Sequence, residues 1–118
     1  MATTVRAARR TFCTASAIEM NQRVKVDADG RISVAAGAET DIGTAARAAF
    51  AENEDVAVDL ASLTGTAQFI ADVPISVGDR VYGANGGEVG VTDTNAPIGI
   101  ALRSAAAGKR VEVLRRQL

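Results

Sequence analysis

The sequence predicts an all-β protein, a small barrel or sandwich built from two copies of one unit. Three observations favour this fold: two hairpin patterns with glycine turns, an internal repeat, and the lack of a convincing helix. The alanine-rich stretch 44–52 is the best candidate for a helix. An Ile-Gly pair at its head and alternating valines after it instead favour a strand that runs into a loop.

The first hairpin pattern lies near the N-terminus. Residues 24–26 and 32–34 alternate apolar and polar side chains around the turn Asp27-Ala28-Asp29-Gly30. We expect Gly30 to adopt the positive φ that such turns require. The two aspartates resemble the start of a calcium loop, but hairpin spacing leaves no room for the remaining ligands, so we expect a turn.

The second hairpin pattern spans residues 80–91. Its turn is Gly83-Ala84-Asn85-Gly86-Gly87, in which Asn85-Gly86 is a pair favoured in tight turns. Glycine-rich loops also bind phosphates, but those loops lead into a helix, and here the chain continues as a strand. We therefore expect a turn here as well.

Both hairpins belong to an internal repeat. The aligned segments are 18–34 with 75–91, 42–47 with 98–103, and 56–58 with 111–113. Arg23 matches Arg80 and Gly30 matches Gly87, and the offset changes only through single-residue differences in loop length. Each copy is expected to contribute a hairpin, an Ile-Gly strand and a Val-x-Val strand.

The residue pattern of the Ile-Gly strand in the second copy predicts which of its side chains belong to the core. Ile98, Ile100 and Leu102 share one face because the side-chain period of a strand is two. We expect that face to be buried. Arg103 and its counterpart Arg47 are expected to point outward.

The expected organisation is an N-terminal arm over residues 1–16, followed by a single β domain over residues 17–118. The repeats and their connector are expected at 17–60, 61–73 and 74–116. The connector contains Thr66-Ala67-Gln68-Phe69-Ile70, which we expect to add one more strand.

Composition excludes several functions for this chain of 118 residues. It has no histidine and one cysteine, Cys13, so histidine relays, zinc–histidine sites and intrachain disulfides are excluded. Glu52, Glu54 and Asp55 form an acidic group, but nothing nearby in the sequence would desolvate one of them for catalysis, and a solvated loop is the simpler interpretation. We expect no enzymatic activity, no metal and no cofactor.

Charge and hydropathy address possible partners. The net charge is −1, but the two ends are basic and the middle is acidic, which suggests that the ends meet a negatively charged partner. Solvated arginines that serve only solubility are the alternative interpretation. No run of apolar residues is long enough for a membrane-spanning helix, and no apolar stretch of the secretory kind follows the first arginines. We expect no membrane partner.

A series of short segments carries a family resemblance. The segments are Val-Gly-Asp-Arg-Val-Tyr (77–82), Gly-Glu-Val (87–89), Pro-Ile-Gly-Ile-Ala-Leu (97–102), Ala-Ala-Ala-Gly (105–108) and Val-Glu-Val (111–113). Together with the earlier copy at 23–30 and 41–45, they resemble the capsid cement, or head decoration, proteins of tailed double-stranded DNA bacteriophages. The resemblance covers about residues 18–116, and the arginine-rich N-terminal segment departs from it.

This resemblance implies a β-tulip-like structural protein on the exterior of the virion. It implies binding to the outer surface of the expanded major-capsid shell, usually as homotrimers, and reinforcement of that shell against internal DNA pressure. The implied partners are the major capsid protein and further copies of the same chain.

Candidate contact residues are mostly basic. Those of the arm, expected to be flexible in the free protein and to order on the capsid, are Arg6, Arg9, Arg10 and Phe12. Those expected at a subunit or capsid interface are Arg47, Tyr82, Arg103, Arg115 and Arg116.

A small-barrel nucleic-acid-binding module is the alternative hypothesis, because Gly-Asp-Arg-Val-Tyr hairpins also occur in such barrels. Sequence-tolerant binding requires exposed aromatic side chains and a basic groove. Only Tyr82 is suitably placed, and the middle of the chain is acidic. Nucleic acid is therefore not the expected partner.

Overall fold

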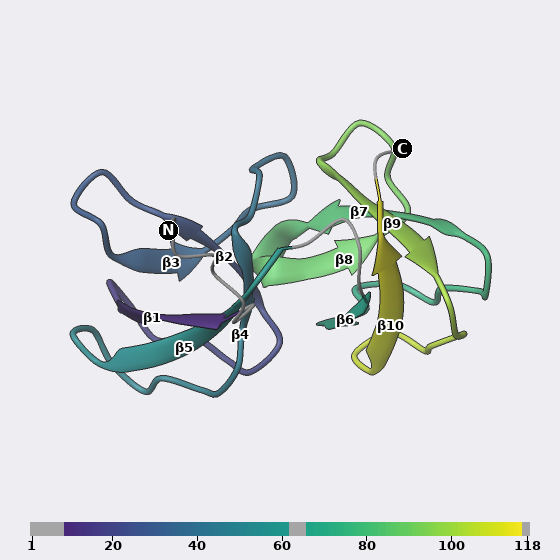
Figure 1. Ribbon diagram of the computed structural model, residues 1–118. Helices are drawn as coiled ribbons and strands as arrows, with labels where there is room; N and C mark the ends of the chain where they lie inside the picture. The colour runs from purple at the N-terminus through teal and green to yellow at the C-terminus, as the bar shows by residue number, and fades with distance from the viewer. Residues whose placement is uncertain (1–8, 62–65, 117–118) are drawn as a thin grey trace, which may run out of the picture.

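Ten strands form two antiparallel sheets in the computed structural model, which describes residues 9–61 and 66–116 (Figure 1). The first sheet contains β1 (Arg9–Cys13), β2 (Arg23–Val26), β3 (Ile32–Val34), β4 (Gly43–Ala45) and β5 (Asp55–Leu60). The second contains β6 (Thr66–Ile70), β7 (Arg80–Ala84), β8 (Glu88–Gly90), β9 (Pro97–Ala101) and β10 (Arg110–Arg115). A short 3-10 turn, η1 (Asn85–Gly87), joins β7 to β8.

The two sheets have the same strand order. The first runs β1-β5-β4-β2-β3 and the second β6-β10-β9-β7-β8, so each strand of the second copy is five numbers above its counterpart. The predicted duplicated all-β fold is therefore confirmed. The expected strand at 66–70 is β6, the counterpart of β1 and the first strand of the second sheet.

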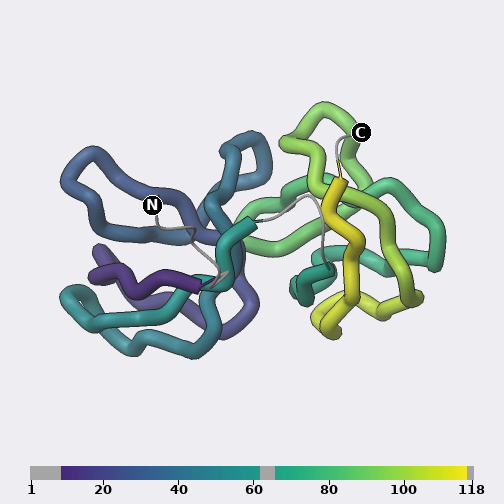
Figure 2. The backbone as a smooth tube through the Cα atoms, in the orientation of Figure 1, coloured from purple at the N-terminus to yellow at the C-terminus, as the bar shows by residue number. Residues whose placement is uncertain are grey.

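Each sheet curls around its own core without closing into a barrel. A single parallel bridge draws the sheet edges together, between Thr14 and Ile32 in the first copy and between Ala71 and Val89 in the second. The buried apolar side chains form two clusters, one for each sheet. The molecule is therefore two lobes side by side, each with a small core (Figure 2).

Both hairpin turns contain left-handed glycines. Gly30 has a φ of 83°, as predicted, and its counterpart Gly87 has a φ of 71°. The first turn is closed by the amide of Asp27, which donates to the carbonyl oxygen of Arg31 at 2.7 Å. It is a turn rather than a calcium loop.

The glycines of the Ile-Gly strands allow neighbouring strands to approach closely. A Cβ atom on Gly43 would collide with the carbonyl oxygen of Asp59, and one on Gly99 would collide with that of Leu114. Asp59 and Leu114 lie at equivalent positions of β5 and β10. The repeated glycine is thus a steric requirement of the fold.

The predicted core face of residues 98–102 is wrong at its C-terminal end. Ile98 is buried, but Ile100 is only partly buried and Leu102 is 40% exposed, whereas Ala101 of the opposite face is buried. The pairing of β7 with β9 shifts between Val81 and Tyr82, and such a bulge interrupts the alternation of side chains. Because of this shift, Ala101 takes the core position that was expected for Leu102.

The predicted flexible arm is wrong from residue 9 onward. Residues 9–13 form β1, which pairs along β5 from Arg9 opposite Asp59 to Cys13 opposite Asp55. Phe12 packs against the first core, at the position that Phe69 occupies in the second. Residues 1–8, with Arg6, lie outside the described residues.

Core substitutions test the corrected strand register. Phe69→Ala should lower the free energy of unfolding by about 3–5 kcal/mol because Phe69 is fully buried. Leu102→Ala should lower it by less than about 1 kcal/mol because Leu102 lies at the surface. Urea denaturation measures both values. If Leu102→Ala lowered the free energy of unfolding as much as Phe69→Ala does, the register predicted from the sequence would be correct.

Candidate functional site

Among the residues that the structure describes, the largest fully buried side chain is an arginine. Arg23, at the start of β2, is 0% exposed. Its guanidinium donates to four backbone carbonyl oxygens, those of Ala36 and Glu39 in the first copy and of Ala84 and Glu88 in the second. The shortest of these bonds is 2.7 Å, to Glu39. One side chain therefore joins the two lobes.

Asp41 lies between two buried arginines. Its Oδ1 is 3.4 Å from Nε of Arg23, and its Oδ2 accepts from Nη2 of Arg115 at 2.5 Å. Arg115 also lies over the ring of Phe69, with its guanidinium carbon 4.9 Å from the ring centroid. Burial lowers the pKa of Arg23, and the charge of Asp41 opposes this. The three side chains Arg23, Asp41 and Arg115 are called the ionic triad below.

The ionic triad corrects the interpretation of Arg115. Its side chain was expected at a subunit or capsid interface, but it is buried inside the chain. The sequence did not indicate that Arg23 is buried either. The repeat aligns it with Arg80, and the structure shows that Arg80 is exposed. The two arginines occupy equivalent strand positions, and only the contact with the other lobe separates them.

The glycine-rich turn of the second hairpin forms the other side of this junction. A Cβ atom on Gly83 would lie 2.7 Å from Nη1 of Arg23 and 2.6 Å from the carbonyl oxygen of Gly37, so only glycine leaves room for the arginine. Three further hydrogen bonds join this turn to the first copy: Gln22 Nε2 to Gly86 O (2.9 Å), Gly87 N to Ala35 O (3.1 Å) and Gly37 N to Asn85 Oδ1 (3.0 Å). The predicted turn is also an element that docks the lobes.

A pair of glycine substitutions tests this packing. Gly83→Ala should lower the free energy of unfolding by about 1–3 kcal/mol, because its new methyl group overpacks the junction. Gly90→Ala is the matched control, since a Cβ atom there meets only ordinary contacts at 3.7 Å and 3.8 Å. Equal thermal melts for the two variants would contradict the close approach at Gly83.

Acidic groups also meet at the junction. Burial raises the pKa of Glu88, and a hydrogen bond with Asp72 and the negative charges of Asp72 and Glu19 raise it further. Glu88 and Asp72 belong to the second copy and Glu19 to the first. Folding therefore favours the protonated form of Glu88.

This shift predicts a pH dependence of stability. Glu88 binds its proton more tightly in the folded than in the unfolded state, so stability falls as pH rises above its ordinary pKa of 4.5. Glu88→Gln should raise Tm by a few degrees near pH 7 and change it little near pH 4. Glu52→Gln, at an exposed glutamate, is the control. An equal effect of Glu88→Gln at both pH values would contradict the shift.

The remaining arm residues lie on the first sheet. Nε of Arg9 is 2.7 Å from Oδ1 of Asp59, and both side chains are exposed. Arg10 lies over the ring of Phe12, with 4.8 Å from the guanidinium carbon to the centroid. Phe12 itself is half-buried and is not an exposed anchor.

The other predicted contact residues are at least partly accessible. Arg47 and Arg103 are exposed, as predicted, and occupy equivalent positions after β4 and β9. Arg47 donates to the carbonyl oxygens of Ala48 and Asp55, and Arg103 lies 3.6 Å from Glu112. Tyr82 is half-buried, and Arg116 is exposed.

Exposed apolar side chains accompany these two arginines. Phe50 is 85% exposed and lies in the loop that carries Arg47; Leu102, 40% exposed, precedes Arg103. Val77 is 64% exposed, and its amide donates to Oγ of Ser104, which follows Arg103. The loops after β4 and β9 both lie along the lower side of the molecule in Figure 1. We call Arg47, Phe50, Val77, Leu102 and Arg103 the loop face.

Two further findings bear on function. Across residues 9–61 and 66–116, no group of three or more acidic or cysteine side chains is placed to hold a metal ion. The same part of the chain contains no helix with the length and hydropathy to cross a membrane.

Comparison with known proteins finds a likeness in fold but none in sequence. No protein-family model matches the chain, and no curated protein matches it in sequence. Among solved structures, the chain is similar to the head fiber gp8.5 N base of bacteriophage phi29, with a TM-score of 0.76 and 20% sequence identity. The two chains share a fold. The match covers 93% of this chain and 97% of the other, so it includes both lobes.

Proposed function

We propose that this protein is a non-enzymatic structural component of a bacteriophage virion. In this proposal it binds the outer surface of the expanded major-capsid shell and stabilises it. The observation that carries the proposal is the likeness in fold to a phage head-fiber base over nearly the whole length of both chains. A head fiber belongs to the phage head, and the proposal extends that location to this chain.

We assign shell contact to the loop face. Arg47 and Arg103 are repeated at equivalent positions, so the duplication presents two positive charges in the same way. Exposed apolar side chains beside them supply area that becomes buried on binding, which contributes more affinity than exposed ion pairs do. This combination fits an acidic surface with apolar hollows. Among the arm residues, Arg6, Arg9 and Arg10 remain in the proposal, whereas Phe12 does not.

We also propose that the protein assembles as a homotrimer, with Arg116 and the half-buried Tyr82 as candidate interface residues. Each lobe has only a small core, so apolar contact with a neighbouring subunit would add to its stability. Three linked copies also convert a weak shell contact into strong attachment through avidity. No observation favours the nucleic-acid alternative, because Tyr82 is half-buried rather than displayed for base stacking.

Cosedimentation with expanded capsids tests this function. Wild-type protein should sediment with capsids of the encoding phage, and Arg47→Glu combined with Arg103→Glu should weaken binding roughly tenfold by charge reversal. Lys25→Glu, on β2 where the side chain pairs with Glu39 rather than with the loop face, is the control and should bind normally. Absence of cosedimentation by the wild type would refute the proposed function, and full binding by the double variant would refute the loop face. Light scattering of the free protein and a reconstruction of decorated capsids test the trimer, and single copies on the capsid would contradict it.

A further inference from the structure

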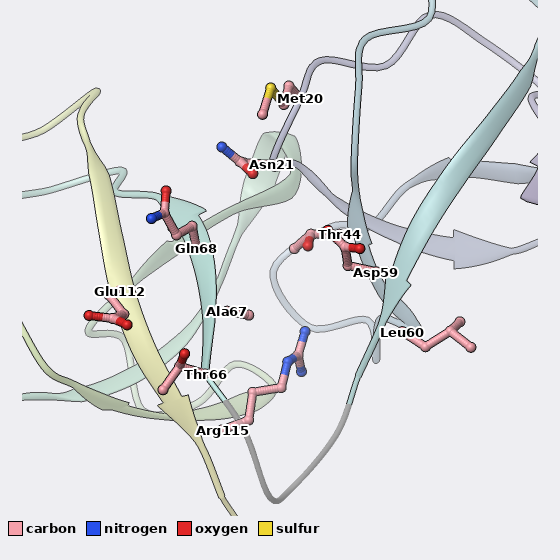
Figure 3. Close-up of a pocket in the computed structure, with 10 residues that line it drawn as sticks. All are labelled: Met20, Asn21, Thr44, Asp59, Leu60, Thr66, Ala67, Gln68, Glu112 and Arg115. Carbon is pink, nitrogen blue, oxygen red and sulfur yellow. The ribbon is translucent and has the colours of Figure 1, made fainter. Parts of the chain in front are cut away.

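A cleft of about 550 Å³ lies where the two lobes meet (Figure 3). Its first wall carries Asn21, Thr44 and Asp59 from the first copy, and its second wall carries Gln68, Glu112 and Arg115 from the second copy. Thr44 and Asp59 are directly opposite each other on β4 and β5, and Gln68 and Glu112 are opposite on β6 and β10. Polar pairs therefore face each other across the cleft.

Asn21 brings an unpaired donor into this cleft. The residue is only 9% exposed, and no group within residues 9–61 and 66–116 accepts a hydrogen bond from its Nδ2. Figure 3 shows its amide projecting into the space between the walls, toward the side that carries Gln68. A buried donor without an acceptor is unfavourable and uncommon in native proteins. A ligand oxygen that enters the cleft would satisfy it once the amide turns toward the ligand.

The internal repeat supplies a comparison for the first wall. Asn21 has a φ of 69°, and its counterpart Gly78 has the same left-handed backbone with a φ of 89° and no side chain. Across the wall, Asn21, Thr44 and Asp59 correspond to Gly78, Ile100 and Leu114. The first copy is thus polar at three cleft-lining positions where the second copy has no hydrogen-bonding side chain. The shared fold does not require these polar groups.

The charges of the cleft are already balanced by neighbours. Asp59 pairs with Arg9, and Glu112 lies near Arg103. Arg115 pairs with Asp41 in the ionic triad. Carboxylates on both walls disfavour an anion. A metal ion is also disfavoured, because no suitable cluster exists in the described part of the chain.

We propose that this cleft binds a neutral, hydroxyl-rich ligand, the class to which monosaccharides and disaccharides belong. Asn21 and Gln68 offer amide donors, and Asp59 and Glu112 offer carboxylate acceptors. A sugar hydroxyl both donates and accepts, so several hydroxyls can satisfy both kinds of group at once. The volume lies within the range of about 300–1,000 Å³ that small-molecule sites occupy.

An NMR titration of the full-length protein tests the proposal. The probes are D-glucose, D-galactose and N-acetyl-D-glucosamine at millimolar concentrations. At least one sugar should produce saturable shifts in the side-chain amide signals of Asn21 and Gln68. Asn21→Gly should weaken that binding roughly tenfold, and it should fold because glycine already occupies the equivalent position 78.

Asn53→Gly is the matched control. Asn53 is the other left-handed asparagine of the described chain, with a φ of 64°; its counterpart is Gly108, and it does not line the cleft. This variant should bind the sugar normally, and Gln68→Ala, at an exposed residue, should weaken binding as Asn21→Gly does. The proposal would be overturned if no sugar produced saturable shifts in the wild-type protein. It would also be overturned if glycerol produced an equal response, or if phosphate or a peptide bound in preference to the sugars. Asn21→Gly should still cosediment with capsids, which separates this test from that of the proposed function.

Discussion

Arg23 is fully buried where the two lobes meet, and carbonyl oxygens from both lobes hold its guanidinium. A buried charge destabilises a protein unless an opposite charge and hydrogen bonds accompany it, so the position of Asp41 is constrained by that of Arg23. Asp41 in turn holds Arg115 from the second copy. The network fixes how the lobes are joined, and the cleft walls, the glycine turn and the placement of the loop face follow from that arrangement.

Duplication and divergence explain different parts of the molecule. The strand order, the Ile-Gly steric contact and the left-handed turn positions recur in both copies, because each sheet must curl around its own core. The junction has no such symmetry. Arg23 is buried while Arg80 is exposed, and Asn21 carries an amide where Gly78 carries none. Contacts between the copies, rather than within them, account for the residues that distinguish the two lobes.

The sequence predicted local features well, because hairpins depend on alternation and turn chemistry within a few residues. Gly30 and the strand at 66–70 are examples. It missed features that depend on distant partners. Phe12 pairs with a strand more than forty residues away, and the bulge at Val81 that exposes Leu102 arises between separate strands. The burial of Arg23 requires the second lobe. One signal for β1 was present, since Phe12 and Phe69 are also 57 residues apart.

The unfolding of an Asp41→Asn variant tests the central role of the ionic triad most directly. The substitution preserves shape but leaves two buried arginines without their counterion. We predict a loss of about 3–5 kcal/mol in the free energy of unfolding, and separate transitions for the two lobes where the wild type has one. Asp93→Asn, at an exposed aspartate, should leave unfolding unchanged. An Asp41→Asn protein with wild-type stability and a single transition would contradict the account.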